Sequence, residues 1–361
     1  MGILEKIKEI EDQMSKTQVH KGTEHHLGML KAKLAKLKRE QLSGGGGGKG
    51  GGSGFSVKKA GNATVAFIGL PSVGKSTLLG ALTGAKSKIA AYAFTTVTCI
   101  PGILHYKGAQ IQLLDLPGII ADARSGRGRG REVMNVARTA DLVLLVVDVF
   151  DPTYVAKLRD ELRGLGIRMD EKPPDIVVEP ASRGGLDIAF TCKQSELTEK
   201  TVQSVVNEYG IFNGSVIVRQ DATVDQLIDV LSGNRIYNQS LVVVNKVDLA
   251  KKGQLDGLDF EFVPISASKN DNIDALKENI FQKLQLIRVY TKTRFKKTDL
   301  NEPMMMKTGA TIGDFCDQVH RDMRSLFKYA QIWGPSAKHP GQKVGLAHVL
   351  LDGDIVQLYK R

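Results

Sequence analysis

The protein contains 361 residues, with 50 Lys and Arg against 39 Asp and Glu, so its formal net charge is +11. Hydrophobic residues make up 42% and charged residues 25% of the chain, values that exclude a wholly disordered protein. The length predicts two or three domains. The basic excess favours an acidic polymer as partner, nucleic acid before an anionic membrane surface.

Cysteine usage and hydropathy exclude two further classes. The three cysteines, Cys99, Cys192 and Cys316, stand far apart and match neither a disulfide framework nor a metal-binding pattern. No apolar run approaches the roughly 20 residues needed to span a bilayer, and the charged start does not read as a signal peptide. We therefore expect a cytoplasmic protein without a membrane partner.

Residues 1–43 are predicted to form a helical hairpin. Each half carries apolar residues at steps of three and four, which place them on one helical face. These are Ile3, Ile7, Ile10 and Met14, then Leu27, Leu30, Leu34 and Leu37. Basic residues surround the second stripe, either as a solvated face or as a docking surface for nucleic acid or a partner. Residues 44–54 contain nine glycines and predict a flexible linker.

Beyond the linker the pattern changes to strands alternating with helices. Short apolar runs predict strands at 65–68, 111–114, 142–147, 241–244 and 262–265, and residues 76–82 predict a helix. Apolar strands separated by helical stretches indicate a mostly parallel sheet that is covered on both faces.

The first strand leads into the pattern G-x-x-x-x-G-K-S. Such a loop turns its backbone N–H groups toward nucleotide phosphates, while its lysine reaches the β- and γ-phosphates and its serine ligates Mg²⁺. The strand before it and the helix after it supply the required context. The residues are Gly69, Leu70, Pro71, Ser72, Val73, Gly74, Lys75 and Ser76.

A second motif, D-x-P-G, follows the strand at 111–114. Asp115 suits a contact to Mg²⁺ through water, and the N–H of Gly118 suits the γ-phosphate; Leu116 and Pro117 lie between them. Between the two motifs, Thr95 or Thr96 is expected to supply a second hydroxyl to the metal. The residues alone do not choose between these threonines.

The most discriminating pattern is N-K-x-D after the strand at 241–244. A carboxylate only accepts hydrogen bonds, so Asp248 suits the ring N–H and the amino group of guanine, and adenine lacks that donor pair. Asn245 is expected to tie this loop to the phosphate loop, with Lys246 and Val247 between them. After the next strand, Ser266, Ala267 and Ser268 are expected to offer a backbone N–H to the guanine carbonyl.

These motifs in this order resemble those of the GTPase superfamily. The residues within and around the motifs resemble those of the developmentally regulated GTP-binding proteins of the Obg-type branch. The specific runs are G-L-P-S-V-G-K-S-T, A-Y-A-F-T-T-V-T-C-I-P-G, D-L-P-G-I-I and G-R-G-R-G-R-E-V. The opening M-G-I-L-E-K-I and the run H-L-G-M-L-K-A-K-L-A-K-L are similar to the type-2 member. This resemblance implies Mg²⁺ at Ser76 and, by register, at Thr96. It implies nucleotide contacts at Gly69–Ser76, Phe94, Thr95, Thr96, Val97, Thr98, Asp115–Gly118, Asn245–Asp248 and Ser266–Ser268.

Two departures from Ras-like GTPases leave the catalytic group unassigned. Gly118 is followed by Ile119 rather than by the glutamine that orients the attacking water, so we expect slow intrinsic hydrolysis. Some relatives use K⁺ together with an asparagine at the fourth position of the phosphate loop. That position is Ser72 here, which leaves a K⁺ requirement open. Arginines after Gly118 offer either a transition-state charge or a basic surface for a partner: Arg124, Arg127, Arg129 and Arg131.

The spacing of the motifs predicts an insertion in the GTPase domain. From Gly118 to Asn245 the gap of 126 residues exceeds what a helix, a strand and a helix need. We place the insert at about 168–225, with a strand at 186–190 and a helix at 196–207. The resemblance implies that it is a small α/β module.

The segment 288–361 has 13 Lys and Arg against 7 Asp and Glu and resembles a TGS domain, a ubiquitin-like β-grasp module. We expect a helix over 312–326, a final strand from Asp354, Trp333 in the core, and Met304–Met306 filling a strand or core gap. His320 and His348 have no third ligand at suitable spacing.

The predicted fold is therefore α/β: a P-loop GTPase domain (62–287) with an N-terminal helical hairpin, a small α/β insert and a C-terminal TGS domain (288–361). The predicted function is that of a Mg²⁺-dependent GTPase switch. The resemblance adds association with translating ribosomes and a regulatory protein of this family as a partner. We expect no homo-oligomer. The alternative is an adaptor that docks on RNA or the ribosome and whose nucleotide is mainly structural.

Overall fold

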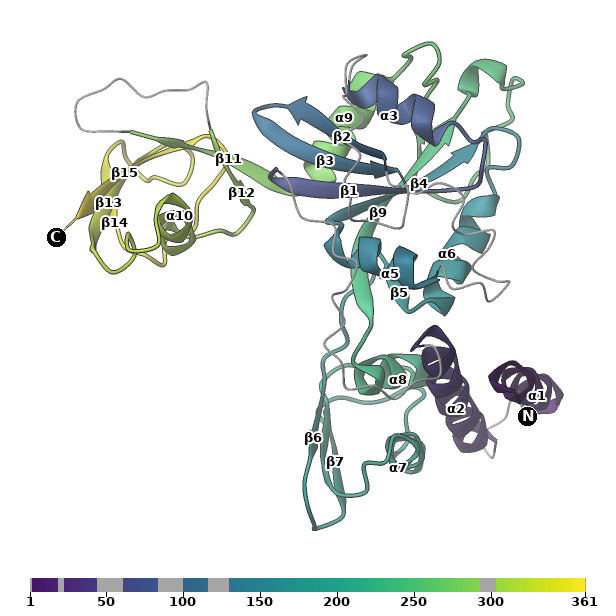
Figure 1. Ribbon diagram of the computed structural model, residues 1–361. Coiled ribbons are helices and arrows are strands. Elements are labelled where there is room, and N and C mark those ends of the chain that lie inside the picture. The colour runs from purple at the N-terminus through teal and green to yellow at the C-terminus, as the bar shows by residue number, and fades with distance from the viewer. Residues whose placement is uncertain are drawn as a thin grey trace. The chain divides into compact units, whose positions relative to one another are not determined.

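The computed structural model describes residues 2–18, 23–43, 61–83, 100–115, 130–292 and 303–360. The glycine-rich linker at 44–54 lies outside them. They divide into two compact units (Figure 1): one contains the described residues within 1–54, 125–134 and 159–238, and the other contains those within 55–124, 135–158 and 239–361. Within the described ranges, no helix has the length and apolar character to cross a bilayer.

The central sheet belongs mainly to the second unit and has the strand order β10-β9-β4-β1-β3-β2. All neighbours in this order pair in parallel except β2 and β3, which are antiparallel. The mostly parallel sheet predicted from the sequence is therefore confirmed. Its strands are β1 (Ala63–Ile68), β2 (Ile100–Tyr106), β3 (Ala109–Asp115), β4 (Leu142–Asp148), β9 (Ile236–Asn245) and β10 (Val263–Pro264).

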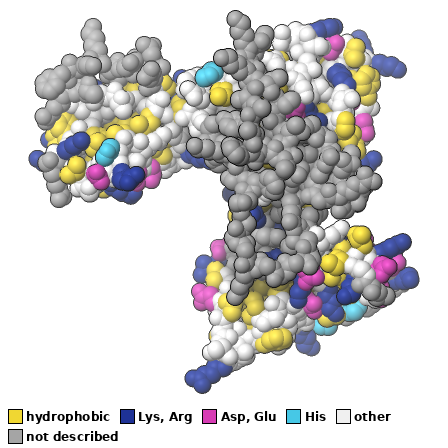
Figure 2. All heavy atoms as spheres, in the orientation of Figure 1, with side chains coloured by type: hydrophobic (Ala, Val, Ile, Leu, Met, Phe, Trp, Pro, Cys, Tyr) yellow, Lys and Arg dark blue, Asp and Glu magenta, His cyan; other side chains and the backbone are white. Residues whose placement is uncertain are grey.

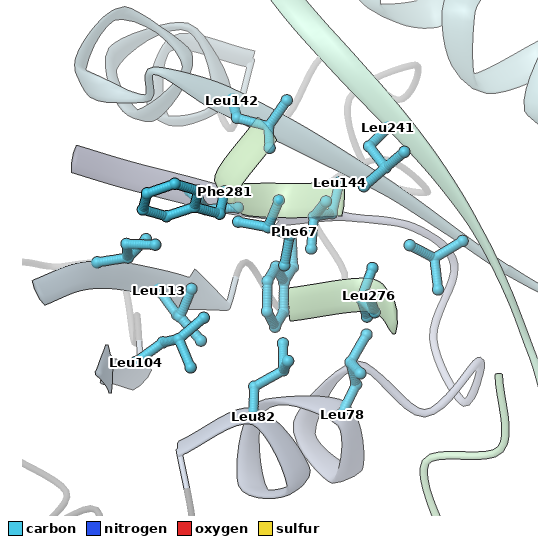
Figure 3. Close-up of a cluster of buried hydrophobic side chains, with 14 of the residues drawn as sticks. Phe67, Leu78, Leu82, Leu104, Leu113, Leu142, Leu144, Leu241, Leu276 and Phe281 are labelled. Atoms are coloured by element: carbon cyan, nitrogen blue, oxygen red, sulfur yellow. The ribbon is translucent and has the colours of Figure 1, made fainter. Parts of the chain in front are cut away.

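Helices cover this sheet on both faces. On one face, α3 (Lys75–Thr83) and α9 (Ile273–Lys283) enclose a cluster around Phe67, which is fully buried (Figure 3). The apolar side chains in this cluster come from strands and helices far apart in the sequence, including Leu78, Leu144 and Leu276. On the opposite face lie α5 (Gly130–Thr139) and α6 (Tyr154–Gly164). This two-sided burial explains why the strands read as unbroken apolar runs.

The first unit contains the helical hairpin and a small three-stranded sheet. Helices α1 (Ile3–Lys16) and α2 (Glu24–Ser43) are linked by an ion pair of 3.0 Å between Lys38 and Glu11. The sheet has the order β6-β8-β7, with β6 (Ile176–Pro180), β7 (Leu186–Phe190) and β8 (Gly214–Val218). Its core also takes in α7 (Glu199–Glu208), α8 (Val224–Ser232) and Ala32 of α2. Helix α8 extends this α/β module beyond residue 225, where the spacing argument ended it.

A buried cluster of charges is centred on Asp229 within α8. The carboxylate of Asp229 accepts two hydrogen bonds of 2.6 Å from Arg168 and one of 2.6 Å from Arg235. The Asp229 and Arg168 side chains are only 4% and 6% exposed. Arg168 directly follows the start of β5 (Ile167–Met169), which pairs with the beginning of β9. The cluster thus joins the α/β module to the strand that leads back into the central sheet.

The C-terminal segment forms a five-stranded sheet of order β12-β11-β15-β13-β14, with α10 against one face. The elements are β11 (Leu286–Thr291), β12 (Met304–Lys307), α10 (Ile312–Val319), β13 (Phe327–Trp333), β14 (Gln342–Val344) and β15 (Asp354–Lys360). Met305 and Met306 are buried, as predicted for this methionine run.

Two expectations for this segment are wrong. The helix ends at Val319 instead of continuing to 326, because His320 adopts an extended conformation with φ −164°. Trp333 lies outside the hydrophobic core cluster and is only half-buried, because strand alternation places it on the face away from α10.

Candidate functional site

The predicted motifs gather at one edge of the central sheet. Strands β1, β3, β9 and β10 end at Ile68, Asp115, Asn245 and Pro264, and the motif residues stand at or directly after these ends. Because the four strands run parallel, their carboxyl ends lie on the same side. This edge is where ligands bind in open α/β sheets.

The loop at 69–76 has the conformation that its sequence requires. Ser72 and Gly74 adopt positive φ angles of 65° and 91°, and α3 begins immediately afterwards at Lys75. The ammonium group of Lys75 donates hydrogen bonds of 2.9 and 2.7 Å to the carbonyl oxygens of Gly69 and Leu70. The lysine is thereby held inside the curve of the loop, at the start of the helix.

Glycine is needed in this loop because of its protein neighbours. A Cβ at Gly69 would lie 2.1 Å from the carbonyl oxygen of Val146 on β4, and a Cβ at Gly74 would lie 2.4 Å from Nδ2 of Asn245. In the structure, the loop packs so tightly on β4 and on the Asn245 side chain that a methyl group has no room.

Burial lowers the pKa of Lys75, and the nearby Asp115 carboxylate opposes that shift. Lys75 is 6% exposed, and its two hydrogen-bond partners in the loop are neutral carbonyls. A buried ammonium without a bonded anion is stabilised strongly by an incoming negative charge. Lys75 is therefore prepared for an anion such as a phosphate.

Ser76 and Asp115 form a pair suited to a hard cation. The Ser76 hydroxyl donates a hydrogen bond of 2.8 Å to Oδ2 of Asp115. Asp115 is 1% exposed, and its Oδ1 is buried without a hydrogen-bond partner among the described residues. A hydroxyl beside a carboxylate with a spare oxygen is a donor set that Mg²⁺ accepts, directly or through water. The residues present therefore fit Mg²⁺.

Asn245 connects the phosphate loop with the loop after β10; the sequence analysis expected only its tie to the phosphate loop. Its Nδ2 donates a hydrogen bond of 2.8 Å to the carbonyl oxygen of Val73, and its Oδ1 accepts one of 3.0 Å from the N–H of Ala267. The side chain is 2% exposed. One amide therefore fixes the distance between two segments that are remote in sequence.

The carboxylate of Asp248 stands in the next turn, η1 (Val247–Leu249). The Ser266 hydroxyl is the main cause that lowers the pKa of Asp248, with a smaller contribution from Lys269. Its Oδ2 lies 3.4 Å from Lys269 Nζ, whereas its Oδ1 is buried without a partner among the described residues. An ionised carboxylate with a spare acceptor suits a ligand that presents N–H donors.

Two side chains around Lys246 escaped the sequence analysis. Lys246 adopts a positive φ of 63°, and its Nζ donates a hydrogen bond of 2.9 Å to Asp148 at the end of β4. The same ammonium lies 5.6 Å from the ring centroid of Phe150, which is 65% exposed. The signal was present, because Asp148 ends the strand next to β9 and its register partner is Asn245.

Some predicted site residues lie outside the described part of the chain. These are Phe94–Thr98, Leu116–Gly118, Ile119 and the arginines at 124, 127 and 129. Over the described ranges there is no group of three or more His, Cys, Asp or Glu that could hold a metal ion.

Comparison with protein families matches most of the chain. Residues 64–179 match the model described as 50S ribosome-binding GTPase, and residues 183–286 match the C-terminal region of that domain. Residues 287–360 match the TGS domain.

Individual relatives match over the full length. A GTP-binding protein of Methanocaldococcus jannaschii is 51% identical, covering 99% of this chain and 93% of that protein. Developmentally-regulated GTP-binding protein 1 of Xenopus laevis is 48% identical, with complete coverage of both chains. In Dictyostelium discoideum the type 1 and type 2 homologues are 49% and 48% identical, so these identities do not separate the types and the type-2 assignment stays a prediction. The chain belongs to the family of developmentally regulated GTP-binding proteins, and it is a GTPase with a C-terminal TGS domain.

Proposed function

We propose that this GTPase binds Mg²⁺-GTP at the carboxyl edge of the central sheet and works as a switch associated with translating ribosomes. The observation that carries the first part is a pair of buried carboxylate oxygens, Oδ1 of Asp115 and Oδ1 of Asp248, without partners among the described residues. Leaving such acceptors unpaired is costly. A cation at the first and the N–H groups of guanine at the second would satisfy both.

Lys75 and the loop at 69–76 bind the phosphates in this proposal. The ammonium exchanges its two carbonyl partners for phosphate oxygens. Their negative charge stabilises the buried ammonium, which has no bonded anion otherwise. Ser76 and Asp115 hold Mg²⁺, and Thr96 completes the set by the family register. The bound metal neutralises charge that develops on the phosphate oxygens.

Guanine recognition falls to the two loops that Asn245 connects. Asp248 accepts from the base, and the N–H groups of Ser266–Ser268 lie in the loop expected to face the guanine carbonyl. The hydrogen bond from Lys246 Nζ to Asp148 fixes the direction of the apolar stem of Lys246. The residue that positions the attacking water is left unassigned, because Ile119 replaces the usual glutamine. Slow intrinsic hydrolysis is the expected result, and K⁺ is a candidate activator.

The ribosome is the proposed partner on two grounds. The matched GTPase model carries a ribosome-binding description, and the net charge of +11 suits a polyanion. A regulatory protein of this family is the second proposed partner. The alternative function, an adaptor with a structural nucleotide, is favoured by the absence of glutamine after Gly118.

Substitution of Asp248 tests the nucleotide assignment. Asp248→Asn should weaken GTP binding and improve binding of xanthosine triphosphate, because xanthine offers a carbonyl where guanine has an amino group. Asp274→Asn on α9, at a side chain 93% exposed, is the matched control and should change neither affinity. Separate calorimetric titrations with Mg²⁺-GTP and with Mg²⁺-xanthosine triphosphate measure the two affinities. Unchanged GTP affinity in Asp248→Asn would contradict the assignment.

Two measurements separate the switch from the adaptor. Ribosome co-sedimentation should differ among GTP, GDP and a non-hydrolysable analogue if the protein is a switch. Single-turnover assays should show γ-phosphate release that increases with ribosomes or K⁺. Nucleotide-independent sedimentation without phosphate release over hours would favour the adaptor.

A further inference from the structure

The sheet of the TGS domain has a face that its own core does not use. Core side chains project toward α10 from alternate strand positions, among them Val289, Ala330, Ile332 and Val356. The intervening positions belong to the other face. The register pairs Tyr329 with Tyr359, Gln331 with Gln357, and Trp333 with Ile355, and Tyr290 lies beside Ile355 on β11.

Aromatic side chains dominate this outer face. The rings of Tyr329 and Tyr359 stack with centroids 4.4 Å apart and an angle of 16°. The Tyr359 hydroxyl donates a hydrogen bond of 2.7 Å to Gln331, which fixes one edge of the stack. Trp333 lies four residues from Tyr329 on the same strand, about 13 Å away at the usual rise of a strand. The face therefore presents two separate aromatic positions.

A lysine accompanies each aromatic position. The Nζ of Lys292 lies 4.1 Å from the ring centroid of Trp333, and that of Lys343 lies 5.0 Å from that of Tyr329. Arg288 is the third cation of the face and is paired with Asp352 at 2.7 Å. The strand positions of the face that the structure describes carry no carboxylate, so Lys292 and Lys343 give it a net positive charge.

The outer face combines aromatic rings with cations. On the face drawn in Figure 2, coloured Lys and Arg side chains are interspersed with Asp and Glu side chains. Net charge alone therefore does not locate a binding surface. Rings and cations combined on one sheet face are a more specific signal, because they match the bases and the phosphates of one ligand.

We propose that this outer face of the TGS sheet binds single-stranded RNA. One base stacks at the Tyr329–Tyr359 position and another at Trp333. The flexible lysines leave the ring faces that the bases occupy and pair with the neighbouring phosphates. Gln331, which lies between the two ring positions on β13, offers its amide N–H groups to base edges, whereas the neighbouring Gln357 is buried, at 6% exposure. This inference rests on the ribosome association proposed above, because the ribosome supplies RNA as the polyanion. A protein ligand is less suited, because the strand positions named above carry one aliphatic side chain, Ile355, among aromatic, amide and basic ones.

The chain itself contains a reporter for this surface, since Trp333 is its one tryptophan. Titration of the full-length protein with a short oligouridylate should quench its tryptophan fluorescence, and the affinity should fall as salt rises. Unchanged fluorescence at saturating oligonucleotide, with binding seen by anisotropy of a labelled oligonucleotide, would place the RNA elsewhere and overturn the proposal. No binding by either readout would also overturn it.

Matched variants separate stacking from charge. Tyr329→Leu should weaken oligonucleotide binding about 10-fold, as expected for one lost base–aromatic stack, whereas Tyr329→Phe should retain it. Lys343→Ala should weaken binding and reduce the salt dependence, whereas Arg321→Ala, at an exposed residue just after α10, should do neither. Equal losses in Lys343→Ala and Arg321→Ala would show that only overall charge matters and would overturn the proposal.

Two further outcomes keep the inference distinct from its premise. Equal competition by an acidic peptide would identify a protein-binding face and overturn the RNA assignment. If the protein sediments with ribosomes but Tyr329→Leu does so equally and binds no less oligonucleotide, the inference fails and the ribosome proposal stands. If the protein does not sediment with ribosomes but binds the oligonucleotide through Tyr329 and Trp333, the inference stands and the ribosome proposal fails.

Discussion

Replacing Asn245 by alanine should destabilise the nucleotide site and the whole GTPase domain together. The substitution removes the hydrogen bonds to Val73 and Ala267 and leaves a buried carbonyl and a buried N–H without a partner. Each group abandoned in this way costs about 1–3 kcal/mol. Because the two losses share one side chain and relax together, we expect about 2–4 kcal/mol in the free energy of unfolding. Against a typical total of about 5–15 kcal/mol this is a large change.

Urea denaturation of the full-length protein, followed by circular dichroism, measures this change. Asn279→Ala on α9 is the matched control, because its amide makes one hydrogen bond of 2.8 Å to the carbonyl of Ala275 within its own helix. Loss of that bond should stay within about 0.5 kcal/mol. Calorimetry with Mg²⁺-GTP should also show weaker binding for Asn245→Ala, since the two loops lose their common anchor.

Equal stability of Asn245→Ala and Asn279→Ala would refute the reasoning. It would mean that the two loops keep their positions without the amide. Normal stability combined with weakened GTP binding would also contradict it, because the hydrogen bonds exist in the protein before any ligand enters.

Two further predictions concern charges elsewhere in the chain. Asp229→Asn should lower the free energy of unfolding by about 3–5 kcal/mol, because it leaves Arg168 and Arg235 without a buried counter-ion; thermal unfolding checks this, and a loss below about 1 kcal/mol typical of surface pairs would contradict it. The carboxyl of Glu278 has its pKa lowered from the ordinary 4.5 to about 2, and the largest cause is the hydrogen bond that it accepts from Lys107. Because the folded-state pKa is depressed, its stabilisation is present above pH 4.5 and is lost as pH falls toward about 2. In Glu278→Gln, the free energy of unfolding should therefore depend less on pH below 4.5. An unchanged pH dependence would show that this carboxyl does not contribute.

The elements of the GTPase core could be predicted because local sequence decides them. A strand that is buried on both faces is mostly apolar, as β1 and β4 are apart from Thr64 and Asp148, and the loop at 69–76 needs glycines in fixed places. The predicted strands were nevertheless too short at β9 and too long at β10. Ladder pairing continues beyond the apolar run in β9, where residues 236–238 pair with β5.

The errors in the TGS domain have a shared cause. The residues at 312–326 have apolar spacing that suits a helix, but tertiary packing requires the chain to turn at His320 so that β13 can begin at Phe327. The single tryptophan suggested a core residue, since large rings are usually buried. Its position relative to α10 follows from strand register, which composition does not contain.

The sequence by itself determined the family of chemistry, because phosphate binding and guanine recognition depend on short motifs whose residue types are dictated by hydrogen-bond donors, acceptors and steric room. Only the tertiary structure decided which atoms meet: that Asn245 bridges Val73 and Ala267, that Asp148 holds Lys246, and that one oxygen each of Asp115 and Asp248 stays buried without a partner among the described residues. These contacts join residues about 20 to 170 positions apart, and they exist because parallel strands bring their ends to one edge of the sheet.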